Sequence, residues 1–130
     1  MNKSKILQSA ISIAVMAHEG QLRKYNNLPY VLHPFEVMAK VATVTNDVEI
    51  LAAAMLHDVF EDGPGNGHFL YDLYSMVMDK CGPRVFNMVF DLTDVYTKEE
   101  FPDHNRKIRK ALEAERLSNV NIHSMTIKLA

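Results

Sequence analysis

An apolar stretch that runs straight into a cluster of charged side chains limits what this chain can fold into. Residues 50–56 are all apolar, and the next six read His57-Asp58-Val59-Phe60-Glu61-Asp62. Such an apolar run predicts the most buried helix of the molecule. Carboxylates at its end would be costly to bury without a partner. A divalent cation would offset this cost, so the sequence predicts a metal site at the end of a core helix.

The spacing of the four ionisable side chains agrees with this prediction. We expect one helix over residues 47–61, in which Glu61 lies four positions after His57 and Asp62 lies four after Asp58. Residues four apart share a face of a helix, so the two pairs form adjacent stripes. We therefore expect all four side chains to converge on one pocket.

Apolar residues recur at helical spacing along most of the chain, and no segment alternates convincingly with period two. This pattern predicts an all-α fold, a bundle of about six to seven helices around the central helix. Asn46 is expected to cap the central helix, with Glu49 three residues on in a capping-box arrangement. The Gly- and Pro-rich segment 63–67 is expected to be a loop of unusual conformational freedom. The other helices are expected over residues 4–18, 33–44, 68–80, 83–92, 105–117 and 123–130.

Composition sets broad limits on function. A chain of 130 residues suits one domain with one core. Its net charge of −2 gives no electrostatic argument for binding nucleic acid or a membrane surface. No apolar run approaches the roughly 20 residues of a membrane span. Cys81 is the one cysteine, so no internal disulfide is possible, and we expect a packed thiol in a reducing, cytoplasmic compartment.

Further candidate site residues precede the central helix. His33, in Tyr30-Val31-Leu32-His33-Pro34, is a candidate metal ligand, although a satisfied ring at a helix start is the alternative. Arg23 and Lys24 form a basic pair in the loop expected over residues 21–32, and a solvated loop is the alternative for them. His18 is expected to be structural, bonded near the loop it precedes. Tyr30 is expected to form a wall of the cleft, with its hydroxyl on a polar neighbour.

Five blocks of the chain belong together: Ala17-His18-Glu19-Gly20-Gln21-Leu22-Arg23-Lys24, Pro29-Tyr30-Val31-Leu32-His33-Pro34-Phe35-Glu36-Val37, Ala53-Ala54-Met55-Leu56-His57-Asp58-Val59-Phe60-Glu61-Asp62, Asn105-Arg106-Lys107 and Ile127-Lys128-Leu129-Ala130. In combination, these blocks resemble the HD superfamily of metal-dependent phosphohydrolases, and most closely the hydrolase domain of the RelA/SpoT family and the small alarmone hydrolases. The resemblance extends over nearly the whole chain and implies an HD-domain helical bundle.

The resemblance implies a role for each matching residue. His33, His57 and Asp58 correspond to ligands of one metal, which is usually manganese in this family, and mixed nitrogen and carboxylate ligands suit such an ion. Glu61 and Asp62 correspond to the acidic pair that orients or deprotonates the attacking water.

The basic pair has a counterpart in the family as well. Arg23 and Lys24 correspond to the residues that contact the nucleotide in this family. Their chemistry suits that role, since an arginine can stack on a base and a lysine can neutralise a phosphate.

Two departures from the family pattern stand out. The fourth ligand of the family is an aspartate directly after the segment that ends here at Ala130, so residues 1–130 are expected to be a single HD domain truncated before its last ligand. Water or another acid, Asp91, Asp94 or Asp103, would then complete the set. The usual threonine after the acidic pair is Gly63 here, which bears on loop rigidity and on the choice of substrate.

The resemblance implies a metal-dependent nucleotide phosphohydrolase, and the first interpretation is an enzyme that removes the 3′-pyrophosphate of guanosine 3′,5′-bis(diphosphate). An HD phosphatase that acts on another nucleotide or phosphoester is the second interpretation. A non-catalytic module that binds a nucleotide or a protein is the third. The acidic pair favours an enzyme, because a pure binder has no use for two carboxylates that repel phosphate. The sequence leaves the oligomeric state open.

Overall fold

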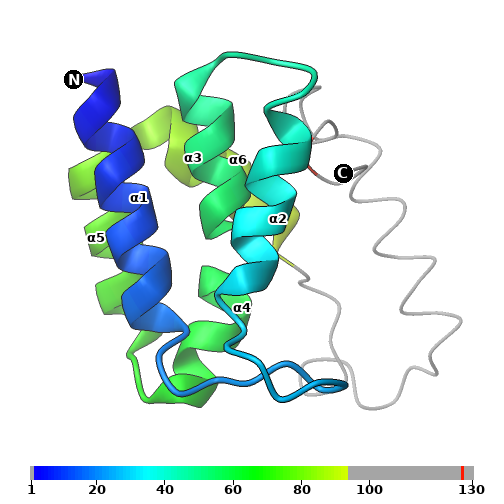
Figure 1. The fold of residues 1–130 in the computed structure, drawn as a ribbon. Helices are drawn as coiled ribbons and strands as arrows, with labels where there is room; N and C mark the ends of the chain where they lie inside the picture. The colour runs from blue at the N-terminus through cyan, green and yellow to red at the C-terminus, as the bar shows by residue number, and fades with distance from the viewer. Residues whose placement is uncertain (1, 94–126, 128–130) are drawn as a thin grey trace, which may run out of the picture.

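Helices form the part of the chain that the structure describes, residues 2–93 and residue 127 of a computed structural model (Figure 1). Apart from a single bridge between Leu22 and Pro29, these residues contain no β-structure. The predicted all-α class is confirmed. The elements are α1 (Lys3–Ala17), α2 (Leu32–Val41), α3 (Val48–Leu56), α4 (Val59–Asp62), the 3₁₀-helix η1 (Gly63–Asn66), α5 (Leu70–Cys81) and α6 (Pro83–Leu92).

The expected helix over residues 105–117 lies outside the described residues. So does the expected helix over residues 123–130, except for Ile127, which is helical and buried in the core.

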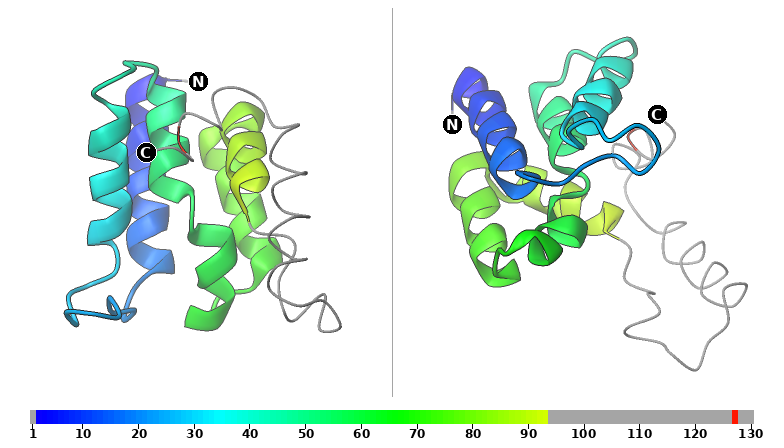
Figure 2. Two further views of the ribbon diagram at one scale, coloured as in Figure 1. Left: turned by 90° about the vertical axis from the view of Figure 1, so that its right-hand side faces the viewer. Right: turned by 60° about the horizontal axis from the view of Figure 1, so that its bottom comes forward.

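Helix α3 is the central helix, as the apolar run predicts. It packs against α1, α2 and α6, and the two further views show these neighbours around it (Figure 2). Its alanines at 52–54 are completely buried, and α1 turns small residues to the core at Ala10, Ala14 and Ala17. Small side chains on both helices let their backbones approach closely. The polar residues at the end of α3 are therefore attached to the most firmly packed part of the bundle.

The central helix is shorter than expected, because it ends at Leu56 and does not continue to Glu61. Asp58 leaves the helical conformation, with φ −102° and ψ 0°, and α4 begins after it. The carbonyl of Ala54, which would accept from the Asp58 N–H in a continuous helix, accepts instead from the His57 ring at 2.7 Å and the His57 N–H at 3.4 Å. The His57 side chain thus competes for a backbone acceptor at the point where the helix breaks.

The N-terminal cap of α3 also differs from the prediction. Asp47, and not Asn46, is the cap, and its carboxylate accepts from the Glu49 N–H at 3.0 Å. Arg84 of α6 donates to both oxygens of Asp47, at 2.9 and 3.1 Å, and to Glu49 at 3.2 Å. A charged cap can pair with this arginine, which an asparagine cannot do as strongly.

The segment expected to be a free loop is a turn of 3₁₀-helix. Gly63–Asn66 follows α4 directly, and the side chain of Asn66 donates to the carbonyl of Ala17 at 3.0 Å. Gly63 is buried, and a Cβ at this position would collide with Leu73 of α5. The glycine is therefore explained by a close approach between two elements.

The lone cysteine is buried, as the sequence predicts. Burial raises the pKa of the Cys81 thiol to about 11, and its sulfur lies 3.8 Å from the carbonyl oxygen of Ile6. A thiol in this state packs as a small apolar side chain. None of the helices in the described part is both long and apolar enough to cross a membrane.

Candidate metal centre

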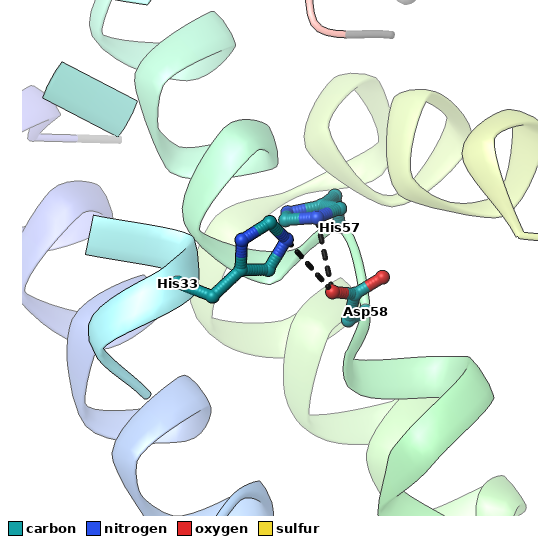
Figure 3. A group of neighbouring side chains, drawn as sticks. All are labelled: His33, His57 and Asp58. Carbon is teal, nitrogen blue, oxygen red and sulfur yellow. Dashed lines mark ion pairs between the residues drawn. The ribbon is translucent and has the colours of Figure 1, made fainter. Parts of the chain in front are cut away.

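Three candidate ligands meet at the end of the bundle where α2 begins and α3 ends. His33 lies in the first turn of α2, while His57 and Asp58 occupy the break after α3. Figure 3 shows the two imidazole rings and the carboxylate turned toward one another. One ligand atom from each residue lies within 4.8 Å of the others. No other group of at least three histidine, cysteine or acidic side chains in the described residues is as compact.

One carboxylate oxygen forms the middle of this group. Oδ2 of Asp58 lies 3.0 Å from Nε2 of His57 and 3.5 Å from Nε2 of His33. The hydroxyl of Tyr30 donates to the same oxygen at 2.7 Å. The Tyr30 ring packs between His18 and His33, with centroid separations of 5.1 and 5.5 Å. The predicted contact of the Tyr30 hydroxyl with a polar neighbour is confirmed, whereas its role as a wall of the cleft stays a prediction.

The backbone fixes which nitrogen of His57 faces the group. A carbonyl oxygen only accepts hydrogen bonds, so Nδ1 of His57 must carry the proton that it donates to Ala54. Nε2 is then the nitrogen that faces Asp58 and His33: in the charged ring it donates to Asp58, and in the neutral ring it presents the lone pair that a metal needs. A second hydrogen bond of this kind is the usual way in which proteins orient a histidine that binds a metal.

The ionisation of the group follows from its burial and its charges. Burial acts to raise the pKa of Asp58, but the hydrogen bonds from His57 and Tyr30 outweigh it, so the pKa lies below its usual value. Burial acts to lower the pKa of His57, but Asp58 outweighs it and raises that pKa. For His33, burial is the largest cause and the pKa is lowered. Burial and the bond to Asp58 together raise the pKa of Tyr30. An ionised carboxylate and a readily neutral histidine are the states that bind cations.

The donor set fits a divalent metal ion. Two imidazole nitrogens and one carboxylate oxygen suit borderline ions such as Mn²⁺, Fe²⁺ and Zn²⁺. Among the acids considered as a fourth ligand, Asp91 is not part of the compact group, whereas Asp94 and Asp103 lie outside the described residues.

The acidic pair lies in α4, after the break, and not in the helix that ends before His57. The Asp62 N–H donates to the carbonyl of Asp58 at 2.9 Å, so Asp62 keeps its position one helical turn after Asp58. Asp62 is half-buried, and burial raises its pKa. Glu61 is exposed, but its charge is near enough to act on Tyr30. Both carboxylates therefore lie close to the candidate ligands, and their predicted catalytic role stays a prediction.

The basic pair lies in the loop before α2. Arg23 donates to Glu36 of α2 at 3.0 Å, and its charge helps to lower the pKa of His33. Glu36 follows His33 by three positions, so this ion pair ties Arg23 to the helix that carries a candidate ligand. Lys24 is exposed beside it.

Two polar residues near the site were missed from the sequence. Gln21 donates to Asp62 at 3.2 Å, and Asn66 donates to Gln21 at 2.8 Å. His18, which Gln21 also contacts at 2.8 Å, has the predicted structural position. The sequence offers one indication for Gln21, which is its place in the block that begins Ala17-His18. It offers none for Asn66, which lies in the Gly- and Pro-rich segment 63–67 that is expected to be a loop.

Comparison with known proteins agrees with this geometry. The model of a family described as HD domain matches residues 10–127. The chain belongs to the HD domain family. The ligand group, the basic loop and the acidic pair all fall inside the matched range of this HD domain, which agrees with the hydrolase class expected from the sequence.

Relatives of this HD domain include much longer bacterial proteins. It is 41% identical over 70 residues to the bifunctional (p)ppGpp synthase/hydrolase SpoT of Escherichia coli (strain K12), an alignment that covers 54% of the chain and 10% of that protein. It is 30% identical over 115 residues to the guanosine-3′,5′-bis(diphosphate) 3′-pyrophosphohydrolase of Aquifex aeolicus, covering 85% of the chain and 15% of that protein. The expected likeness to the RelA/SpoT hydrolase domain is confirmed.

Proposed function

We propose that this HD domain is a metal-dependent phosphohydrolase that acts on a nucleotide. The observation that supports the proposal most directly is the compact group of His33, His57 and Asp58, whose ligand atoms lie within 4.8 Å of one another. These three residues would hold the divalent ion, for which manganese is our choice. Such an ion would supply Lewis-acid polarisation and would increase the acidity of water in the site.

The acidic pair handles the attacking water. Asp62 accepts a proton from it, a role for which a half-buried carboxylate with a raised pKa is suited. Glu61, exposed at the neighbouring position, orients the water from the solvent side. Phosphate esters are anionic, and the cation offsets the repulsion that two carboxylates would otherwise exert on them.

The basic loop receives the nucleotide. The guanidinium of Arg23, held by Glu36, presents a planar surface on which a base can stack, and Lys24 neutralises a phosphate. We propose guanosine 3′,5′-bis(diphosphate) as the substrate, with release of the 3′-pyrophosphate as one unit. This choice is supported by the likeness to the guanosine-3′,5′-bis(diphosphate) 3′-pyrophosphohydrolase of Aquifex aeolicus.

A product assay tests the proposal. The purified protein is incubated with Mn²⁺ and each of a panel of substrates: guanosine 3′,5′-bis(diphosphate), guanosine triphosphate, nucleoside monophosphates and a simple aryl phosphate. Intact pyrophosphate from the first substrate is the expected product. Orthophosphate from another member of the panel would instead identify an HD phosphatase with a different substrate.

Matched variants connect the activity to the site. Asp58→Ala is expected to abolish hydrolysis of every substrate, and Asp62→Asn to lower kcat about 10²–10⁴-fold while leaving bound metal unchanged. Asp79→Asn, on the exposed face of α5, is the control and is expected to keep full activity. Tight nucleotide binding without any product, in protein loaded with Mn²⁺, would contradict the hydrolase and favour a binding module.

A further inference from the structure

A small hydrogen-bond network behind the acidic pair joins four elements of the fold. Gln21 is its centre: its Oε1 lies 2.8 Å from Nδ1 of His18 and 2.8 Å from Nδ2 of Asn66, and its Nε2 lies 3.2 Å from Oδ2 of Asp62. Asn66 also reaches the carbonyl of Ala17 at 3.0 Å. The end of α1, the loop that follows it, the end of α4 and η1 are thereby connected through side chains.

The direction of every bond in this network is determined by one backbone group. The carbonyl of Ala17 only accepts, so Asn66 turns its NH₂ group toward it and toward Gln21. Gln21 must then present its side-chain oxygen to Asn66. As a result, the NH₂ group of Gln21 faces Asp62 and donates to its carboxylate. His18 faces the same oxygen, so its Nδ1 carries a proton. Asp62 therefore receives a donor whose orientation is not free to reverse.

The burial of His18 adds an independent sign of function. Its ring is 2% exposed, and within the described residues its Nε2 has no hydrogen-bond partner. A buried polar atom without a partner is unusual and calls for an explanation. A small apolar residue would fill this place without that penalty, but it could not donate to Gln21. The chain thus tolerates an unsatisfied atom in order to hold the glutamine.

Asp62 has a reason to need such support. It is the last residue of α4, a helix of only four residues, and the carboxylate torsion of aspartate is broad rather than confined to narrow wells. A catalytic group that is displaced by about 1 Å can lose roughly 10²-fold in rate. A fixed donor on one carboxylate oxygen restricts that rotation.

From these contacts we infer that Gln21 is a positioning residue, which holds the Asp62 carboxylate in its working orientation through a donor whose direction His18 and Asn66 impose. This inference rests on the proposed function, because it takes its meaning from the role of Asp62 in proton transfer. It predicts an effect on kcat, with little effect on KM or on bound metal.

Two substitutions of Gln21 separate positioning from packing. Gln21→Glu keeps the length of the side chain and can still accept from His18 and Asn66, but it removes the donor to Asp62. Gln21→Met keeps the volume and removes all three bonds. Both are expected to lower kcat about 10–100-fold with KM and Mn²⁺ content unchanged. Arg84→Gln, which breaks an ion pair between α3 and α6, is the control for a general loss of stability and is expected to leave kcat unaltered.

A double-mutant cycle with Asp62→Asn completes the test. If Gln21 acts through Asp62, Gln21→Met has no further effect on kcat once Asp62 is replaced. Wild-type kcat in Gln21→Glu, or effects of Gln21→Met and Asp62→Asn that multiply, would overturn the positioning role and leave the hydrolase intact. Wild-type protein that binds Mn²⁺ but hydrolyses no phosphoester would overturn the proposed function, and this inference with it.

Discussion

At the scale of single residues, one oxygen atom organises the candidate centre. Oδ2 of Asp58 faces both histidine rings and also accepts from the hydroxyl of Tyr30. That hydroxyl cannot be a ligand of the usual kind while its pKa is raised and its proton is donated. Its contribution is to keep the carboxylate turned toward His33 and His57. Partners of this kind, behind the ligands, typically change metal affinity by about 10–100-fold.

Removing this hydroxyl gives the first prediction. Tyr30→Phe keeps the ring between His18 and His33 but leaves Oδ2 of Asp58 without its donor. We expect this variant to bind Mn²⁺ at least about 10-fold more weakly than the wild type does, as measured by calorimetric titration. Tyr71→Phe, at a hydroxyl that lies on an exposed side chain, should bind as the wild type does. Equal affinities in both variants would remove Tyr30 from the description of the centre.

At the scale of elements, an ion pair fastens the start of the central helix. Arg84 of α6 holds Asp47 and Glu49 of α3, and the hydrogen bond from Arg84 is the largest cause of the lowered pKa of Asp47. A carboxylate whose pKa is lowered by folding stabilises the native state above its unfolded pKa. This contribution disappears as the pH falls through the folded pKa.

The second prediction follows from that sign. Asp47→Asn keeps a good N-cap but loses the charge, so it should lower the free energy of unfolding by about 1 kcal/mol at neutral pH, since all three side chains are partly exposed. As the pH falls through the lowered pKa of folded Asp47, the wild type loses this contribution too, and the two proteins should become equally stable. Urea unfolding across this pH range measures the difference. If the difference in free energy of unfolding persisted in acid, the charge of Asp47 would not be its cause.

The contact between η1 and α5 gives a third prediction. Gly63 has an ordinary helical backbone, but Leu73 occupies the space where a Cβ would stand, and Leu73 is fully buried. Gly63→Ala is therefore expected to destabilise the protein by about 1–3 kcal/mol. Leu73→Val in the same chain should recover part of the loss, so that the double variant is more stable than the sum of the single effects. Additive losses in thermal unfolding would contradict the close approach.

At the scale of the whole molecule, the sequence predicts packing better than it predicts the geometry at the ends of elements. The apolar run at 50–56 identifies the central helix, because burial of such a run leaves no alternative. The break after Leu56 is not predictable from periodicity, since it depends on a hydrogen bond from the His57 ring to its own helix. Gln21 and Asn66 were missed because their partners are distant in sequence.

The fourth prediction concerns the metal and the bundle together. The candidate ligands come from α2 and from the end of α3, so an ion bound by them links two helices and binds the native state alone. At 100 times its dissociation constant, Mn²⁺ should raise the free energy of unfolding by about 2.7 kcal/mol. Thermal unfolding with and without a chelator measures this increase. Asp58→Asn should show no increase, and an equal shift in that variant would place the ion elsewhere.

The connection between α1 and α2 has a base and a tip with separate duties. At the base, the backbone N–H of Tyr30 donates to the backbone carbonyl of Gln21 at 2.8 Å, and that of Arg23 donates to the backbone carbonyl of Leu28 at 2.7 Å. The tip, residues 24–28, is exposed. Substitutions at residues 24–28 therefore leave the Tyr30 hydroxyl and the Gln21 side-chain amide in place. The exposed surface of this loop can thus vary by single substitutions without disturbing the contacts of Tyr30 with Asp58 and of Gln21 with Asp62.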